Sequence, residues 1–284
     1  MATAPAAKPA PQPQEIVIYS HSNLFYWWPV WACGFIMAIV TAFSGQSLAI
    51  VPNNTKPMTS QVVPGLGDDK DRRDILVVPQ KTQLPRDKDK QPIEPKLHVS
   101  NSKNVGTWFC TVLLLVIFIT NVPLRGLWSV IVIVTVVFVS IIFALVQINE
   151  QSIWDHIFHF LFFLDIRINM GGYLFISIIL FILWFLVSMF FDKQIYMVFS
   201  PSQFKVHMEI GGGETAYDTM GMTIEKRRND LFRHLILGFG SGDLVVKTTG
   251  AQSHTFEIPN VLSLGRRVRE IEDMLRSKQV LPGN

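Results

Sequence analysis

Four long apolar runs decide what this chain can fold into. Residues 105–148 contain only one Asp, Glu, Lys or Arg side chain, which is Arg125. About 20 apolar residues in a helix span the hydrocarbon core of a bilayer, which is ~30 Å thick. Charged residues make up 17% of the chain, whereas soluble domains carry about 25%. The sequence therefore excludes a soluble globular protein and predicts a multi-pass membrane protein.

The predicted transmembrane helices are residues 27–51, 105–122, 126–148 and 172–191. The first begins in a cluster of aromatic side chains, among them Trp27, Trp28 and Trp31, which is typical of the headgroup level. Only residues 123–125 separate the second run from the third, so these two are expected to form a helical hairpin. The third run is rich in Val and Ile, but a single span in lipid must satisfy its own backbone, which favours a helix.

The segment between the third and fourth runs has an amphipathic helical pattern. On a helical wheel of residues 151–168, aromatic and aliphatic side chains share one arc. Polar side chains that include Asp155, His156 and His159 share the opposite arc. Charged residues near the end of the segment make spanning costly. We therefore expect a helix that lies in the membrane interface.

Two polar segments lack the apolar residues that a core needs. Residues 1–26 are predicted to form a low-complexity N-terminal tail, whose first half is mainly Ala, Pro, Gln and Lys. Residues 52–104 contain seven prolines, ten Lys or Arg and seven Asp or Glu. A polar segment of this length is expected to be a flexible loop or an interaction arm. Such arms can order on a partner subunit or serve only as linkers, and the sequence leaves both open.

Residues 194–284 differ in kind from the rest. Short runs rich in Val, Ile and Phe alternate apolar and polar residues, which is the pattern of half-buried strands. The expected strands are 195–199, 204–210, 215–218, 222–227, 243–249 and 255–258. From Asn260 to Ser277, apolar residues recur every three or four positions, which predicts an amphipathic helix capped by Asn260 or Ser263. The pattern predicts a small all-β domain closed by one α-helix.

The stretch from Glu225 to Leu275 resembles the C-terminal half of bacterial pleckstrin-homology-like (PH-like) domains. The matching elements are a Leu-rich turn, a Gly-x-Gly-Asp strand and an apolar-Pro/Asn-Val element before the final helix, at Leu231–Leu237, Gly240–Val246 and Ile258–Val261. The resemblance extends over 194–284 and implies a PH-like fold with a cytoplasmic location. In phosphoinositide-binding members of that superfamily a basic loop joins the first two strands. Here that turn is Ser200-Pro201-Ser202, so the resemblance carries over no headgroup site.

Basic side chains form two small clusters in this domain. Together with the three tryptophans, they are the candidate contacts with lipid or a partner: Arg227, Arg228, Arg266, Arg267 and Arg269. A cation near an anionic membrane surface contributes about 1 kcal/mol. Acidic neighbours dilute both clusters, so a solvated or subunit-facing surface is the competing interpretation. The net charge is only +3, and no nucleic-acid partner is predicted.

No cofactor, metal or catalytic site is predicted. His156, His159 and Asp155 are the candidate metal ligands, but two histidines and one carboxylate without a fourth ligand make a thin site. The solvent-exposed face of an interfacial helix is an alternative explanation for these three polar residues. Residues 238–243 are Gly-rich, but a strand follows and no Gly-Lys-Ser/Thr is present, so we expect a turn, not a phosphate loop. Both cysteines lie in apolar runs and predict no disulfide.

These observations predict four spans, with both termini on one side of the membrane and residues 52–104 on the other. The resemblance to bacterial PH-like domains implies a bacterial inner membrane with the termini in the cytoplasm and residues 52–104 outside. The leading functional interpretation is a non-catalytic scaffold or accessory subunit. It would self-associate or dock on a larger membrane complex through its arms and PH-like domain. A channel or transporter component, gated by the interfacial helix, is the alternative, and an enzyme acting on lipid is a third. The expected partners are the bilayer, copies of this chain and other membrane subunits.

Overall fold

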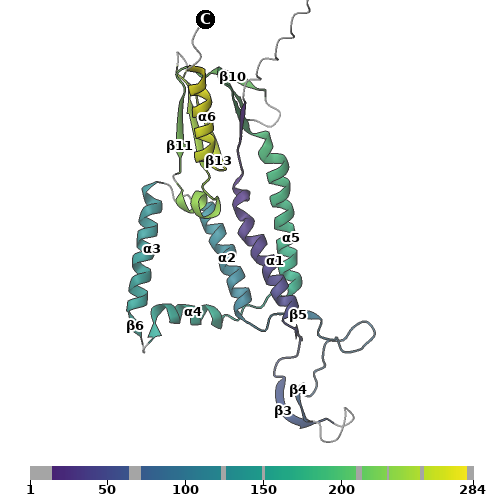
Figure 1. Ribbon diagram of the computed structural model, residues 1–284. Helices are drawn as coiled ribbons and strands as arrows, with labels where there is room; N and C mark the ends of the chain where they lie inside the picture. The colour runs from purple at the N-terminus through teal and green to yellow at the C-terminus, as the bar shows by residue number, and fades with distance from the viewer. Residues whose placement is uncertain are drawn as a thin grey trace, which may run out of the picture.

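The computed structural model describes residues 15–63, 72–122, 126–148, 151–208, 213–228, 230–249 and 253–279. Figure 1 shows an elongated molecule with a β-domain at one end, long helices in the middle and an arm of short strands at the opposite end. The first strand and the last helix both belong to the β-domain. The two ends of the described chain therefore lie on the same side of the long helices.

Four helical stretches are long and apolar enough to cross a membrane. They are Asn23–Phe43, Asn104–Asn121, Leu127–Leu145 and Met170–Gln194. The first joins η1 (Asn23–Trp27) to α1 (Trp28–Phe43), the second is α2 and the third is α3. The fourth joins α5 (Met170–Leu186) to η2 (Val187–Phe191) and η3 (Asp192–Gln194). The first stretch ends at Phe43 and not at the expected residue 51, because Gly45 turns the chain with a φ of 63°.

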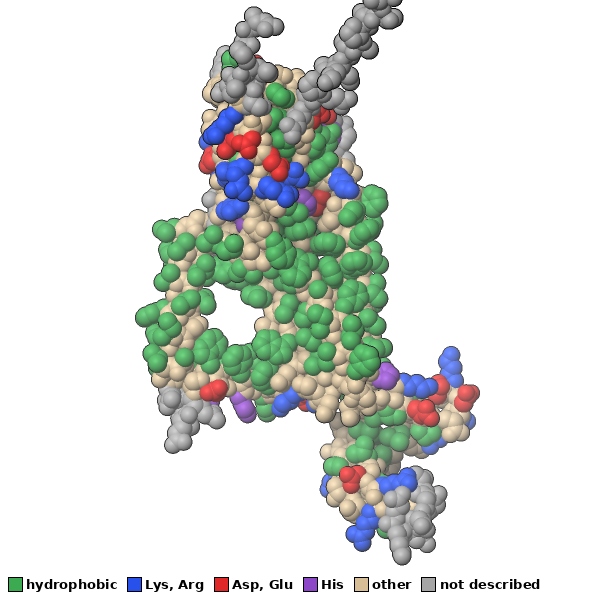
Figure 2. Space-filling view, viewed as in Figure 1, with side chains coloured by type: hydrophobic (Ala, Val, Ile, Leu, Met, Phe, Trp, Pro, Cys, Tyr) green, Lys and Arg blue, Asp and Glu red, His purple; other side chains and the backbone are tan. Residues whose placement is uncertain are grey.

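Three of these stretches pack into one bundle, whereas α3 stands apart. A side chain at Gly34 on α1 would collide with Oγ of Ser177 on α5, so a small residue lets the two helices approach closely. By contrast, α3 makes its contacts with the segment that follows it. There the Trp154 indole donates to the Ser140 carbonyl oxygen (3.1 Å). Figure 2 shows an opening between α3 and the bundle.

The expected interfacial helix is α4 (Ile153–Phe163), shorter than the predicted 151–168. A capping box begins it: Ser152 Oγ accepts from the Asp155 N–H (3.2 Å), and the Asp155 carboxylate accepts from the Ser152 N–H (3.0 Å). Two short strands, β6 (Gln147–Ile148) and β7 (Gln151–Ser152), join it to α3. In Figure 1, α4 runs across the ends of the long helices and not alongside them.

The β-domain consists of two antiparallel sheets and a helix. The first sheet has the order β1 (Ile16–Tyr19), β8 (Tyr196–Phe199), β9 (Gln203–His207) and β10 (Thr215–Asp218). The second has the order β11 (Thr223–Arg227), β12 (Gly242–Lys247) and β13 (Thr255–Val261). A π-helical turn, η4 (Phe232–Leu237), precedes β12. The closing helix, α6 (Leu264–Gln279), places Leu264, Val268 and Ile271 in the shared core. From β8 onward, the strands lie close to the predicted positions.

The first strand is the main departure from the sequence-based expectation. The tail predicted for residues 1–26 is not low-complexity throughout, because Ile16–Tyr19 forms β1 and pairs antiparallel with β8. Ile18 lies opposite Met197 and is only 1% exposed in the domain core. All four helical stretches are therefore inserted between two neighbouring strands of one sheet. The rest of that predicted tail, residues 1–14, lies outside the described residues.

The arm between α1 and α2 contains two pairs of short strands. Next to the helix ends, β2 (Gln46–Leu48) pairs with β5 (Leu97–Val99). Farther out, β3 (Lys56–Val62) pairs with β4 (Arg72–Val77). The segment 52–104, predicted as a loop or arm, therefore contains some regular structure. Most of its side chains are exposed, including aliphatic ones such as Leu76 and Ile93.

Candidate functional site

A buried polar cluster joins the helices to the β-domain. Tyr26, on η1, extends its hydroxyl into the domain, where it donates to Oδ1 of Asn260 (3.0 Å) and lies 2.9 Å from Oγ of Ser241. Nδ1 of His234, on η4, lies 3.1 Å from the same Oγ. All four side chains are buried. We call these four residues the polar junction, because they tie the start of the first helical stretch to three parts of the β-domain.

Charged groups surround the polar junction. Asp243 accepts from the Asn260 backbone N–H (3.0 Å) and lies 3.6 Å from Nε2 of His234. Arg233 lies 4.0 Å from Asp243 and donates to Oδ1 of Asn23 (3.3 Å). Burial raises the pKa of Asp243, but the hydrogen bonds from His234 and the Asn260 amide outweigh it and hold this pKa below its ordinary value. Asp243 is therefore a carboxylate at neutral pH.

The order Ser241, His234, Asp243 resembles a nucleophile-base-acid relay. However, Ser241 is 0% exposed and His234 is 1% exposed, so no substrate reaches either group. The Tyr26 hydroxyl occupies the space next to the Ser241 oxygen, because these two atoms are hydrogen-bonded to each other. A side chain at Gly238 would come within 2.7 Å of the Tyr26 ring, which explains one glycine of the Gly-rich turn. The cluster is buried and holds two parts of the fold together.

A pocket of ≈ 500 Å³ lies beside the polar junction. Its lining includes Asp192, from the end of the fourth helical stretch, and Arg233, from the β-domain. Asp192 is 5% exposed; its Oδ1 accepts from the Ser22 N–H (3.0 Å), and its Oδ2 has no hydrogen-bond partner among the described residues. His21 also lines the pocket, and burial lowers its pKa, so this imidazole is neutral at pH 7. We call this the junction pocket.

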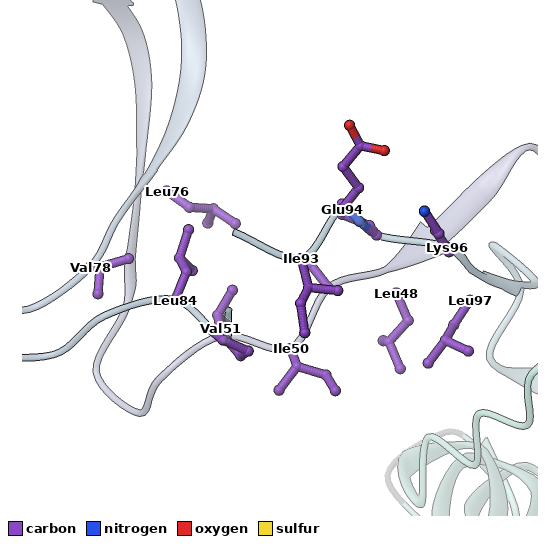
Figure 3. Close-up of a pocket in the computed structure, with 13 residues that line it drawn as sticks. Leu48, Ile50, Val51, Leu76, Val78, Leu84, Ile93, Glu94, Lys96 and Leu97 are labelled. Atoms are coloured by element: carbon purple, nitrogen blue, oxygen red, sulfur yellow. The ribbon is translucent and has the colours of Figure 1, made fainter. Parts of the chain in front are cut away.

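A second pocket, of ≈ 380 Å³, lies in the arm and is shown in Figure 3. Of its lining side chains, only those of Glu94 and Lys96 carry charge, and Figure 3 shows the Glu94 carboxylate directed away from the aliphatic groups. Such a lining suits an aliphatic group. We call it the arm pocket. Its aliphatic residues are Leu48, Ile50, Val51, Leu76, Val78, Leu84, Ile93 and Leu97.

In the predicted basic cluster on β11, Arg227 forms an ion pair with Glu225. Arg227 donates two hydrogen bonds to Glu225 (2.9 and 3.1 Å), and Lys247 lies 3.1 Å from the same carboxylate. Hydrogen bonds from these two cations lower the pKa of Glu225 to about 2. Arg269, on α6, is exposed. The β11 cluster therefore presents little uncompensated positive charge.

Three further arginines lie together at one end of the β-domain. Arg228 donates to the Gly240 carbonyl oxygen (3.1 Å) in the turn after η4, and η4 contacts α2. Arg266 and Arg267, in the first turn of α6, pair with Glu270 at 3.5 and 3.2 Å. Figure 2 shows Lys and Arg side chains just above the hydrophobic band of the long helices. Contact of these arginines with headgroups stays a prediction.

The three tryptophans expected at the headgroup level make contacts within the chain. Trp28 stacks on Phe239 of the β-domain, with ring centroids 5.4 Å apart. Trp31 packs against Trp184 of α5 at 5.5 Å, and Trp27 is partly buried against the helix bundle. The tryptophans therefore join α1 to α5 and to the β-domain. Their role at a membrane surface stays a prediction.

The candidate metal ligands on α4 do not form a cluster. Asp155 is engaged in the capping box, and His156 and His159 are exposed. Among the described residues, no group of three or more His, Cys, Asp or Glu side chains is placed to hold a metal ion. Both cysteines of the chain are free.

Sequence reasoning did not find the contacts that build the polar junction. It named Asn260 only as a candidate cap of the closing helix, whereas Asn260 lies in β13 and the helix begins at Leu264. In the sequence, Tyr26 is one of several aromatic residues at the start of the first apolar run, and Asp192 directly follows the end of the fourth run. Their one signal is a polar group at the edge of an apolar run, which does not indicate a partner more than 200 residues away, as for Tyr26 and His234. Comparison with protein-family models, curated proteins and solved structures finds no match for this chain. The geometry of the two pockets is therefore the basis for the functional proposal.

Proposed function

We propose that this chain is a multi-pass membrane protein that acts as a non-catalytic scaffold or accessory subunit and docks on a larger membrane complex through its arm. The arm pocket is the observation that carries this proposal. Its aliphatic side chains come from several segments of the arm, and several of them are exposed to solvent. Exposed contiguous apolar surface of this kind marks interaction sites. An aliphatic segment of a partner subunit would bury it.

The helices support a membrane location and further contacts within the bilayer. All four stretches have the length and composition of spans. In α3 most side chains are exposed, among them Leu127, Trp128 and Phe138 at 73%, 69% and 62%. In lipid such a helix meets acyl chains or the helix of another subunit. Either environment is compatible with a scaffold or accessory subunit.

The expected orientation follows from the resemblance to bacterial PH-like domains, which implies a cytoplasmic β-domain. An antiparallel domain closed by a C-terminal helix supports the resemblance to bacterial PH-like domains. Four spans put this domain on one side of the membrane and the arm on the other. In a bacterial inner membrane the β-domain would then be cytoplasmic, with Arg228, Arg266 and Arg267 near anionic headgroups.

The docking proposal is tested by two matched pairs of substitutions in the arm. Leu84→Ser with Ile93→Ser removes aliphatic groups from the arm pocket, whereas Met58→Ser with Val62→Ser makes a similar change on β3, outside it. We expect the first pair to reduce the detergent-extracted assembly to single chains in native mass spectrometry, and the second pair to leave it intact. Assemblies of equal mass for both pairs would contradict the proposal. So would ion conductance by the wild type in liposomes, which favours a channel component.

Single cysteines test the orientation independently. After both native cysteines are replaced, a cysteine at Thr82 in the arm is expected to react with an impermeant thiol reagent in intact cells. A cysteine at Ser253 in the β-domain is expected to be protected until the cells are opened. The opposite labelling would invert the orientation without affecting the docking proposal.

A further inference from the structure

The junction pocket carries an excess of negative charge. Three carboxylates line it, those of Asp192, Asp243 and Glu257, together with one guanidinium, that of Arg233. His21 is neutral near pH 7, so these side chains leave a net charge of −2 when the carboxylates are ionised. A pocket of that sign attracts a cation.

One acceptor in this pocket has no donor among the described residues, and two potential donors in the same lining, the Ser22 hydroxyl and Nε of Arg233, have no hydrogen-bond partner either. Asp192 is 5% exposed, and its Oδ2 lacks a hydrogen-bond partner among the described residues, although Oδ1 is bonded to the Ser22 N–H. A buried acceptor without a donor costs free energy, so such groups point to a missing ligand or ion. A metal ion does not fit, because no three potential ligands converge in the described part of the chain. A positively charged N–H group satisfies both the charge and the acceptor.

The depth of the pocket indicates what molecule carries that group. Val187 and Phe191, from the last turns of the fourth helical stretch, form an apolar side of the pocket. That stretch is one of the four candidate spans, and Figure 2 shows that polar side chains begin where its hydrophobic band ends. A molecule at this depth meets headgroup chemistry on one side and acyl chains on the other.

We propose that the junction pocket binds a primary ammonium group, supplied by the ethanolamine headgroup of a phospholipid, with Oδ2 of Asp192 as the acceptor of its N–H. The choline headgroup carries the same charge and phosphate but no N–H, so it cannot make this hydrogen bond. The inference rests on the membrane location in the proposed function and is independent of the arm pocket.

The test uses the full-length protein, extracted from membranes and exchanged into micelles with equal amounts of phosphatidylethanolamine and phosphatidylcholine. Native mass spectrometry then counts the lipids that stay bound. We expect the wild type to retain phosphatidylethanolamine about tenfold over phosphatidylcholine, the ratio that one charge-assisted hydrogen bond provides. Asp192→Asn should abolish the preference. Asp273→Asn makes the same chemical change on an exposed position of α6 and should keep it.

Further arms of the experiment separate the sources of the amine. Free ethanolamine that raises the melting temperature of the wild type but not of Asp192→Asn, with no lipid retained, would assign the pocket to a soluble amine and overturn the lipid. Equal retention of both lipids by the wild type would overturn the proposal, as would an unchanged preference in Asp192→Asn. If that variant fails to fold, Val187→Trp fills the apolar side and leaves Asp192 in place. A preference that survives Val187→Trp also overturns the proposal.

The lipid proposal and the docking proposal fail separately. A protein that loses its assembly through the arm substitutions but still prefers phosphatidylethanolamine retains the junction site without the docking function. Release of the protein from membranes by an alkaline wash would remove the membrane location that both proposals share.

Discussion

The β-domain and the arm contain the same kinds of aliphatic side chain in opposite environments. In the β-domain, Leu244 and Ile258 are fully buried, whereas Ile50 and Ile93 in the arm are 68% and 56% exposed. Burial of apolar surface contributes about 25 cal/mol per Å², so the domain gains stability from its own residues and the arm gains little. The difference indicates that the domain is stabilised by its own core, and it is the contrast on which the proposed docking through the arm depends.

The largest effect expected from this comparison is that of Ile271→Asp on α6. Ile271 is fully buried in the domain core, and the substitution would place a carboxylate there without a partner. Burying such a charge costs several kcal/mol. We expect rapid amide hydrogen exchange throughout β12 and β13 in the full-length protein, measured by mass spectrometry. Exchange as slow as in the wild type would show that α6 does not close the core.

Ile18→Ala tests whether β1 is a part of the domain. Its side chain is buried beside Met197, so the substitution removes packing and leaves a cavity, at a cost of about 2–5 kcal/mol. Faster exchange is expected in β8 and β9 of the full-length protein, while the helices stay protected. The neighbouring exposed Tyr19→Ala serves as the control. Equal exchange in the two variants would show that residues 16–19 do not contribute to the domain core.

Local patterns were enough to predict much of this fold. The strands of 194–284 and the closing helix follow from periodicity within their own segments, and the four apolar helices follow from the length of each apolar run. β1 does not, because four residues, Ile16–Tyr19, become a strand only beside β8, and that partner lies beyond all four helical stretches. The junction pocket and the arm pocket were also out of reach. Each combines segments distant in sequence, and no single one of those segments has a motif.

The third largest loss of stability is expected from a substitution in the polar junction. Tyr26→Phe keeps the ring but removes the hydroxyl that donates to Asn260 and contacts Ser241. The acceptor on Asn260 is then left buried without that donor, which costs about 1–3 kcal/mol. The expected result is a lower melting temperature for the β-domain in the detergent-solubilised protein. An unchanged melting temperature would mean that water replaces the hydroxyl at the junction.

A smaller effect is expected from the ion pairs on the domain surface. The pKa of Glu225 is lowered from 4.5 to about 2 by its hydrogen bonds with Arg227 and Lys247. Because the folded-state pKa is below the unfolded one, this carboxylate stabilises the domain above pH 4.5, and the contribution disappears as the pH falls to about 2. The group is exposed, so the contribution is small and screened by salt. Wild type and Glu225→Gln should therefore differ in melting temperature at pH 6 and converge near pH 2. A difference that grows on acidification would contradict this assignment.

The smallest effect belongs to the arm and completes the comparison. Ile50→Ser replaces an aliphatic side chain that is 68% exposed, and surface substitutions of this kind change stability by about 0.5 kcal/mol or less. The melting temperature of the isolated protein should not move, whereas Ile258→Ser in the β-domain core should lower it strongly. In the native assembly, Ile50→Ser should weaken binding to the partner more than Ile258→Ser does. Ile50 lines the arm pocket and would be buried only when the partner is bound. If Ile50→Ser destabilises the isolated protein as much as Ile258→Ser does, the arm has a core of its own. Its apolar residues would then be structural, and the contrast between the two regions would be lost.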